Sequence, residues 1–271
     1  MKSASEQEAL QWQVTVWDRI SQLYLCEIDP RFTPVVEGVI RRACLKPGEK
    51  VLDLGTGTAS LAIEAAALVG ATGRVTAVDI SPEMLSLAKG RVAESGSSNI
   101  ELCEGRAEEI PAEDAAFDVV LASLSLMYVI DRAAAARELR RVLRPGGRLV
   151  AAVWAGPERC DIVLFQQTAG KFAPAPPVSG VGPGALADPA AFLEQLTRVG
   201  INARAEAEEL AFTFDRFELA WEVLAGVTTA QLAPERQQEA KEAVQAVMWP
   251  HGDGSRPFRN TTQFIVGQVS A

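Results

Sequence analysis

The segment from Val51 to Trp154 alternates short apolar runs with amphipathic stretches, and this alternation constrains the fold more than any other feature of the chain. Apolar runs of about four to eight residues are typical of strands buried on both faces. Amphipathic stretches between such runs are typical of helices that cover a parallel sheet. We therefore expect an α/β protein with a doubly wound, mostly parallel sheet. The candidate strands are Lys50–Leu54, Arg74–Asp79, Asn99–Cys103, Phe117–Ala122 and Arg148–Trp154.

Two of the intervening helices have clear boundary residues. Ser81 is a good N-cap and Pro82 suits the first helical position, so a helix is expected after the second strand. Asp131 can cap a later helix, which Pro145-Gly146-Gly147 should end before the fifth strand. The chain therefore repeats the unit strand, helix, strand.

The flanking regions add helices and two more strands. Glu6–Tyr24 places Leu10, Val14, Trp17 and Tyr24 on one face of an amphipathic helix, which needs an apolar partner. Further helices are expected at Ile162–Lys171, Asp188–Val199 and Phe214–Met248, the last as one broken helix or two, and further strands at Ala203–Leu210 and Phe258–Val269.

The charge balance narrows the range of partners. Lys plus Arg number 26 and Asp plus Glu number 35, which gives a net charge of −9 at pH 7 and a field that repels phosphate backbones and anionic lipid. No apolar run reaches the roughly 18 residues that span a bilayer. The polar start of the chain lacks the basic region and apolar core of a secretory signal. We expect no nucleic-acid partner, no membrane span and a cytoplasmic location.

Cysteine and histidine usage does not indicate a metal site. The four cysteines match no zinc or redox spacing and are expected to be free thiols in apolar surroundings; they are Cys26, Cys44, Cys103 and Cys160. His251 is the only histidine and lies in a loop-like stretch, which excludes any site that needs two histidine ligands. No metal is therefore expected.

A glycine-containing turn follows the first strand at the place where doubly wound sheets bind ligands. Gly55 and Gly57 let the backbone approach a ligand closely, and Asp79 ends the second strand, where its carboxylate can accept hydrogen bonds from ribose hydroxyls. Asp53 introduces an anion that disfavours a pyrophosphate but favours a ligand with an ammonium or sulfonium group. A nicotinamide-dependent oxidoreductase is the weaker alternative, because Asp53 and Ala59 argue against it.

The same residues resemble the class I S-adenosylmethionine-dependent methyltransferases, and within them the ubiquinone/menaquinone-biosynthesis type and related small-molecule methyltransferases. The matching motifs occur in the order and spacing of that family. They are VLDLGTGTA at 51–59, VTAVDISPEML at 75–85, EGRAEEIP at 104–111, FDVVLASLSL at 117–126, LRRVLRPGGRLVAAVW at 139–154 and GPGALADPAAFLEQLTRVGI at 182–201.

The resemblance implies a Rossmann-like methyltransferase fold, with a seven-stranded sheet whose last strand is antiparallel, under a helical lid. It implies a single domain over 1–271, with a lid at 1–45, a cofactor-binding core at 46–155, a substrate-side insert and helices at 156–250, and the final strand at 251–271. It also implies that S-adenosyl-L-methionine is the cofactor. The residues expected to bind it are Asp53, Gly55, Thr56, Gly57, Asp79, Ile80, Met84, Arg106, Ala107 and Ser123.

Three positions depart from the family pattern. Arg106 stands where relatives commonly have an aspartate that meets the adenine amino group, and a guanidinium cannot accept that hydrogen bond. A surface position is the simpler expectation for this arginine. Tyr128 replaces a common histidine, and Ala59 replaces a common glycine, whose role we take to be close packing.

The end of the fourth strand narrows the acceptor. Ala122-Ser123-Leu124-Ser125 lacks both the tetrapeptide of amide and adenine methyltransferases and the carboxylates of metal-dependent catechol methyltransferases. Trp17, Tyr24 and Tyr128 are candidate substrate contacts, with packing as the alternative, and no catalytic base stands out. We expect a methyltransferase for a small, mostly apolar or aromatic molecule, acting on O, C or N, with a homodimer possible. The alternative is a protein of the same fold that binds the cofactor without methyl transfer.

Overall fold

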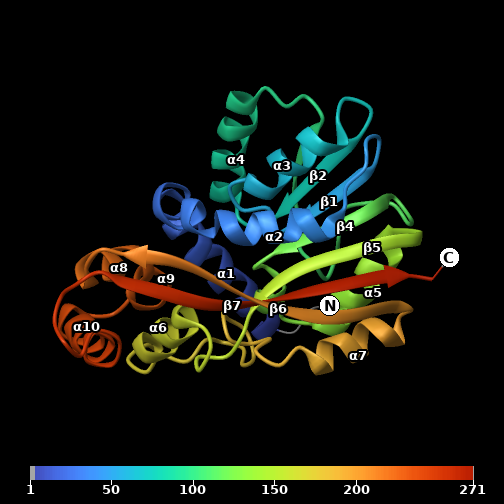
Figure 1. Ribbon diagram of the computed structural model, residues 1–271. Coiled ribbons are helices and arrows are strands. Elements are labelled where there is room, and N and C mark those ends of the chain that lie inside the picture. Colours follow the sequence, from blue (N-terminus) through green and yellow to red (C-terminus); the bar gives the residue numbers. More distant parts are fainter. Residues whose placement is uncertain (1–3, 271) are drawn as a thin grey trace.

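One seven-stranded sheet forms the centre of the computed structural model, which describes residues 4–270 (Figure 1). The strand order is β3-β2-β1-β4-β5-β7-β6. Neighbouring strands from β3 to β5 are parallel, whereas β7 is antiparallel to both β5 and β6. The predicted fold class, with an antiparallel last strand, is confirmed. The strands are β1 (Lys50–Leu54), β2 (Arg74–Asp79), β3 (Ile100–Glu104), β4 (Phe117–Ser123), β5 (Leu143–Trp154), β6 (Ile201–Phe214) and β7 (Arg256–Val269).

Helices cover both faces of the sheet, as buried parallel strands require. Figure 1 shows α2 (Thr33–Ala43), α3 (Ser60–Val69) and α4 (Pro82–Ser95) on one face. It shows α5 (Arg132–Val142) and α7 (Ala190–Arg198) on the other face. Ser81 accepts a hydrogen bond from the Met84 amide and Asp131 accepts one from the Ala134 amide, so both predicted N-caps are confirmed.

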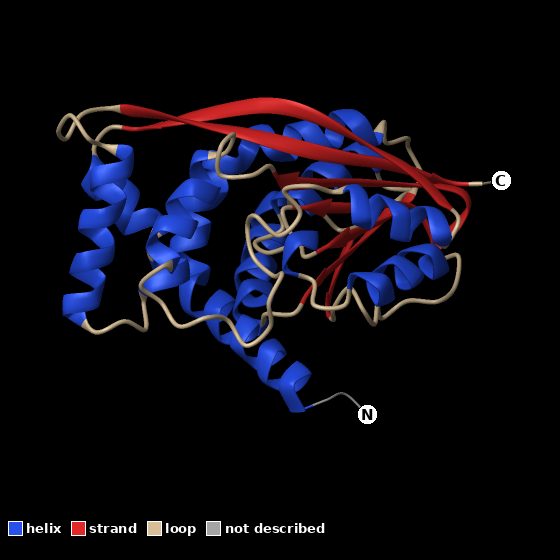
Figure 2. Cartoon of the chain, turned by 90° about the horizontal axis from the view of Figure 1, so that it is seen from below, coloured by secondary structure: helices blue, strands red, loops and turns tan. Residues whose placement is uncertain are grey.

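A second group of helices lies at the far end of the long strands β6 and β7 (Figure 2). The group comprises α6 (Asp161–Gly170), α8 (Phe217–Leu224), α9 (Gly226–Thr229) and α10 (Pro234–Met248). Between this group and the sheet runs α1 (Ala4–Leu23), which contacts both α4 and α9 and continues through a π-helical turn at Tyr24–Ile28 and a 3-10 turn at Asp29–Phe32. Helix α1, together with the helices that cover the sheet, thus encloses the carboxyl ends of β1, β2 and β4.

Several boundaries differ from the predictions. Pro145-Gly146-Gly147 does not end α5 but lies inside β5, where the register against β4 shifts between Phe117 and Val119. The last helical region contains three helices instead of one or two. Strand β6 runs on to Phe214, because its end packs in an aromatic cluster with Phe258 on β7 at a ring separation of 4.9 Å. The sequence pattern does not reveal such a long-range partner.

The predicted lid at residues 1–45 is divided in the structure. Helix α2, which the periodicity analysis missed, packs on β4, β5 and β7 and belongs to the sheet layers. Its buried face, Val35, Val36, Val39 and Ala43, has ordinary helical spacing that could have identified it. Of residues 4–45, α1 and the turn that begins at Tyr24 contribute to the cover over the carboxyl ends of the strands. Within residues 4–270, no helix is both long enough and apolar enough to cross a membrane.

Candidate functional site

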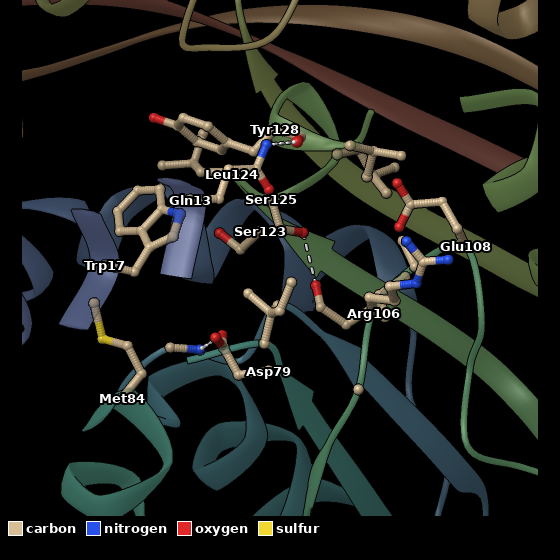
Figure 3. Close-up of a pocket in the computed structure, with 18 of the residues that line it drawn as sticks. Gln13, Trp17, Asp79, Met84, Arg106, Glu108, Ser123, Leu124, Ser125 and Tyr128 are labelled. Atoms are coloured by element: carbon tan, nitrogen blue, oxygen red, sulfur yellow. Dashed lines mark hydrogen bonds between the residues drawn. The ribbon is translucent and has the colours of Figure 1, made fainter. Parts of the chain in front are cut away.

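A narrow cavity of about 120 Å³ lies where β1, β2 and β4 end. Eleven of the thirteen residues predicted to bind cofactor or substrate line it; the exceptions are Asp53 and Thr56. Figure 3 shows Trp17 and Met84 on one side of the cavity and Arg106 and Glu108 on the other. The predicted residues in the lining are Trp17, Tyr24, Gly55, Gly57, Asp79, Ile80, Met84, Arg106, Ala107, Ser123 and Tyr128.

The turn after β1 needs glycine at two positions for different reasons. A Cβ atom on Gly55 would lie 2.3 Å from the Cβ of Ser125, whose hydroxyl donates a 2.7 Å hydrogen bond to the Leu54 carbonyl. Gly57 has a φ of +54° and its missing side chain faces Tyr24, so a larger residue there would be strained and would enter the cavity. The turn therefore brings bare backbone to the cavity wall.

The carboxylate of Asp79 is held in a fixed orientation at the end of β2. One oxygen accepts a 2.8 Å hydrogen bond from the Gly57 amide and the other a 2.9 Å hydrogen bond from the Ser81 amide. Burial raises the pKa of this carboxyl, although the amides favour its charged form. Each oxygen keeps a further lone pair, so the group can accept two more hydrogen bonds from a ligand diol.

Asp53 does not line the cavity, contrary to the predicted direct contact. Its side chain is buried and accepts a 2.7 Å hydrogen bond from the Thr56 hydroxyl, which likewise is not part of the lining. Burial is the main cause that raises the pKa of Asp53 to about 7, and the nearby charge of Asp79 raises it further. Asp53 and Thr56 are therefore hydrogen-bonded to each other within the turn that follows β1.

An aromatic wall is formed by Trp17 of α1, Tyr24 of the π-helical turn that follows it, and Tyr128 of the segment after β4. Trp17 meets Tyr128 edge to face at 4.9 Å and Tyr24 at 6.3 Å. Gln13 joins this wall by donating a 2.6 Å hydrogen bond to the Tyr128 carbonyl. Burial raises the pKa of both tyrosine hydroxyls far above neutrality, so neither phenol is a base at pH 7.

We did not identify Gln13 as a site residue from the sequence, although its position on the helix could have indicated that it lines the cavity. It follows Leu10 by three residues and precedes Trp17 by four, so it is the polar residue on the helical face that lines the cavity. A polar side chain that interrupts an apolar face needs a hydrogen-bond partner when buried. That partner is the chain after β4, which the sequence alone does not place beside α1.

Arg106 is not the surface residue that we expected. Its side chain is only 16% exposed, lines the cavity and forms an ion pair of 3.8 Å with Glu109. The neighbouring Glu108 accepts hydrogen bonds from the amides of Ile130 and Asp131, and thereby links this wall to the start of α5. The guanidinium thus belongs to the end of the cavity opposite Trp17.

A second chamber of about 730 Å³ adjoins the first cavity. The two share Gln13, Trp17 and Tyr128 in their linings, so these side chains form the partition between them. The rest of the chamber is formed by α1, α6, the Pro/Gly-rich connection and α9. Its volume lies within the roughly 300 to 1,000 Å³ of small-molecule sites.

The remaining candidate groups lie elsewhere. His251 is exposed in its loop. All four cysteines are free, but Cys26 and Cys44 are exposed, so the predicted apolar surroundings are wrong for these two. Over the described range 4–270, no group of three or more His, Cys, Asp or Glu side chains is placed to hold a metal ion.

Comparison with known proteins supports the methyltransferase resemblance of the segment that contains β1 to β5. Residues 45–168 match the family described as "Methyltransferase domain". The ubiquinone/menaquinone biosynthesis C-methyltransferase of Vibrio vulnificus is 40% identical over 106 residues, which cover 39% of this chain and 41% of that protein. Residues 45–168 are therefore similar to a methyltransferase domain, and the resemblance inferred from the motifs is confirmed. The matched segment spans less than half the length of this curated relative.

Solved structures extend the likeness in fold to nearly the whole chain. Phosphoethanolamine N-methyltransferase 2 of Haemonchus contortus superposes with a TM-score of 0.60 at 16% identity and covers 94% of this chain and 58% of that one. The cyclase SpnF superposes with a TM-score of 0.58 at 21% identity and covers 88% of this chain and 80% of its own. The fold is that of the Rossmann-like methyltransferases.

Proposed function

We propose that this protein is an S-adenosylmethionine-dependent methyltransferase whose acceptor is a small, mostly apolar or aromatic molecule. The observation that carries the proposal is the pair of adjoining cavities that share Gln13, Trp17 and Tyr128. One cavity presents the oriented carboxylate of Asp79, and the other is large enough for an acceptor. A methyl group must pass between two ligands, and a shared partition gives them a place to meet.

The lining of the first cavity fits the proposed cofactor in most respects. Asp79 suits the ribose hydroxyls, Ile80 and Met84 supply apolar walls, and the buried charge of Asp53 favours a cationic methionine end. Arg106 is the exception, because a guanidinium cannot accept a hydrogen bond from the adenine amino group. Since about 120 Å³ is less than typical ligand sites, we also expect the aromatic side chains of Trp17 and Tyr24 to move when the cofactor binds.

The protein's part in the reaction is positioning and exclusion of water. When bound, S-adenosylmethionine would supply a sulfonium methyl group, whose carbon would bond to the nucleophile in line as its bond to sulfur breaks and S-adenosylhomocysteine leaves. Asp79 and the turn at Gly55–Gly57 fix one partner, and the chamber walls fix the other, which is the main contribution that such a displacement needs. The hydroxyls of Tyr24 and Tyr128 stay protonated at neutral pH, so they can donate and accept hydrogen bonds but cannot act as phenolate bases. The acceptor atom should therefore be nucleophilic without a protein base.

The alternative is a protein that binds the cofactor but does not transfer methyl. The similarity in fold to a cyclase supports keeping it, because fold alone does not determine the reaction. The relative from Vibrio vulnificus is named for ubiquinone and menaquinone biosynthesis, and a quinol is accordingly one acceptor worth assaying. We also propose a cytoplasmic location, a single domain and no nucleic-acid partner; a homodimer is compatible with this proposal.

The test combines binding and turnover. Calorimetry should give a saturable isotherm with S-adenosylhomocysteine and none with NAD, and Gly57→Val should abolish the isotherm because its side chain enters the cavity. Gly96→Val is the matched control, since Gly96 also has a positive φ (+70°) but has open space around it. Methyl transfer from radiolabelled S-adenosylmethionine to phenols, quinols and amines then separates the two functions. Normal binding by Gly57→Val would contradict the cofactor site, and binding without turnover on any acceptor would favour the alternative.

A further inference from the structure

The charged residues that line the second chamber are all cationic. Its described lining contains Arg19 and Lys171 and no aspartate, glutamate or histidine. This contrasts with the chain as a whole, in which acidic residues outnumber basic ones by 35 to 26. Both cations are exposed, so they lie where the chamber opens to solvent.

Arg19 and Lys171 approach the chamber from different helices but flank the same short element. The Arg19 guanidinium donates a 3.4 Å hydrogen bond to the carbonyl of Gly226, the first residue of α9. Gly170, next to Lys171, faces the same element, because a Cβ atom there would lie 3.6 Å from the Thr228 methyl carbon. Arg19 thus contacts α9 directly, and Lys171 follows a residue that faces the same helix in the lining of the chamber.

The interior of the chamber is apolar by comparison. Its walls carry aliphatic and proline side chains from α1, α6, the 171–185 connection and α9. Two side-chain amides in the lining already form hydrogen bonds within the protein. Gln13 donates to the Tyr128 carbonyl, and Gln166 donates to the Leu224 carbonyl. An acceptor therefore meets apolar walls inside and positive charge at the opening.

We propose that the acceptor bound in the second chamber has an apolar body and one anionic group, such as a carboxylate, attracted by Arg19 and Lys171 at the opening of the chamber. This inference deepens the methyltransferase proposal and rests on it. The apolar body extends toward the partition of Gln13, Trp17 and Tyr128, while the anionic group stays near solvent and avoids the cost of full burial. The same two cations disfavour an acceptor that carries an ammonium group.

A matched pair of fluorescent probes tests the charge preference. N-phenyl-1-naphthylamine is neutral, and 8-anilinonaphthalene-1-sulfonate has the same ring system with one added sulfonate. Titrations use the full chain saturated with S-adenosylhomocysteine, so that the first cavity is blocked. We expect the sulfonate to bind about threefold to tenfold more tightly than the neutral probe, as two exposed ion pairs allow. The variant Arg19→Gln/Lys171→Gln should remove this preference and leave the neutral probe's affinity unchanged.

Two further variants keep the test specific. Lys89→Gln/Arg137→Gln changes the net charge equally at exposed positions outside the chamber and should leave both affinities unchanged. Gly170→Phe places a ring against Thr228 and should weaken both probes together. The proposal is overturned if the probes bind equally, if neither binds, if Arg19→Gln/Lys171→Gln has no effect, or if Gly170→Phe leaves both bound. Failure of S-adenosylhomocysteine to bind in calorimetry would instead count against the proposed function, while the probe comparison would still report on the chamber.

Discussion

The side-chain amide of Gln13 donates a 2.6 Å hydrogen bond to the main-chain carbonyl of Tyr128, across 115 residues of sequence. This bond fastens α1 to the segment after β4, at the partition between the two cavities. Trp17, four residues further along α1, packs edge to face on the ring of the same Tyr128. At this partition, α1 is therefore held by a polar contact and an aromatic pair on neighbouring turns.

Replacing Gln13 should impair turnover more than cofactor binding. Gln13→Leu leaves the Tyr128 carbonyl without its partner, which costs about 1 to 3 kcal/mol and loosens the partition. We expect methyl transfer to fall severalfold or more, and S-adenosylhomocysteine affinity by less than about threefold, because Asp79 and the glycine turn stay intact. Gln11→Leu, at an exposed position of the same helix, is the control for each assay. Equal losses in the two variants would mean that the contact has no role in positioning.

Removing the Asp79 carboxylate should weaken cofactor binding directly. Asp79→Ala deletes charge-assisted hydrogen bonds to the ligand and releases the Gly57 and Ser81 amides, so we expect a loss of about 1.5 to 3 kcal/mol in S-adenosylhomocysteine binding. Calorimetry measures the change, with exposed Glu64→Ala as the control. Unchanged affinity for Asp79→Ala would refute the ribose assignment.

Arg106→Asp tests the most unusual residue of the site. We expect it to tighten S-adenosylhomocysteine binding about threefold to tenfold, because a carboxylate can accept the adenine amino hydrogens whereas a guanidinium cannot. Arg106→Ala separates loss of the guanidinium from gain of an acceptor and should give a smaller effect. A silent Arg106→Asp variant would place the adenine away from this end of the cavity.

A partly buried ion pair between Asp29 and Arg91 connects the segment after α1 to α4, beside the glycine turn. Asp29 accepts hydrogen bonds from Thr58, Ser60 and Arg91, the last at 2.6 Å. Asp29→Asn should lower the free energy of unfolding by about 1 to 3 kcal/mol. The reason is that a neutral amide accepts a weaker hydrogen bond from the Arg91 guanidinium, which remains partly buried. Glu27→Gln weakens a single i,i+4 pair with Arg31, in which the carboxylate is 40% exposed, and should cost less, about 0.5 kcal/mol. Urea denaturation compares them, and similar losses would show that the Asp29 network has no special weight.

Local chemistry explains which parts of this protein could be predicted from its sequence. The strands β1, β2 and β4 and the caps at Ser81 and Asp131 are encoded by neighbouring residues, and so they were found within a residue or two. Ala59 shows the limit: we assigned the family's glycine there to close packing, but its φ of +69° shows a backbone reason as well. Three features could not be predicted because they depend on segments far apart in sequence, which no local pattern brings together. These are the contact of Gln13 with the Tyr128 carbonyl, the burial of the Arg106 side chain and the second chamber.

The last prediction concerns pH and follows from Asp53. Burial raises the pKa of this carboxyl from 3.8 to about 7 in the folded protein, so ionisation is harder in the native state than in the unfolded chain. Below pH 4 the group is protonated in both states and costs nothing. As pH rises from 4 to 7 the native state loses stability relative to the unfolded state, and above pH 7 this cost is constant. Asp53→Asn should therefore raise the melting temperature relative to wild type at pH 8 but not at pH 4.

A cationic ligand reverses this penalty, because it favours the charged form of Asp53. S-adenosylmethionine binding near pH 6.5 should therefore release protons, and its affinity should increase with pH by at most about tenfold per unit. Calorimetry in two buffers with different ionisation enthalpies counts the protons. Asp53→Asn should flatten the profile, whereas His251→Gln, which removes the only histidine from an exposed loop, should leave it unchanged. A profile that keeps its slope in Asp53→Asn would mean that another group carries the proton and that the charge of Asp53 does not act on the cofactor.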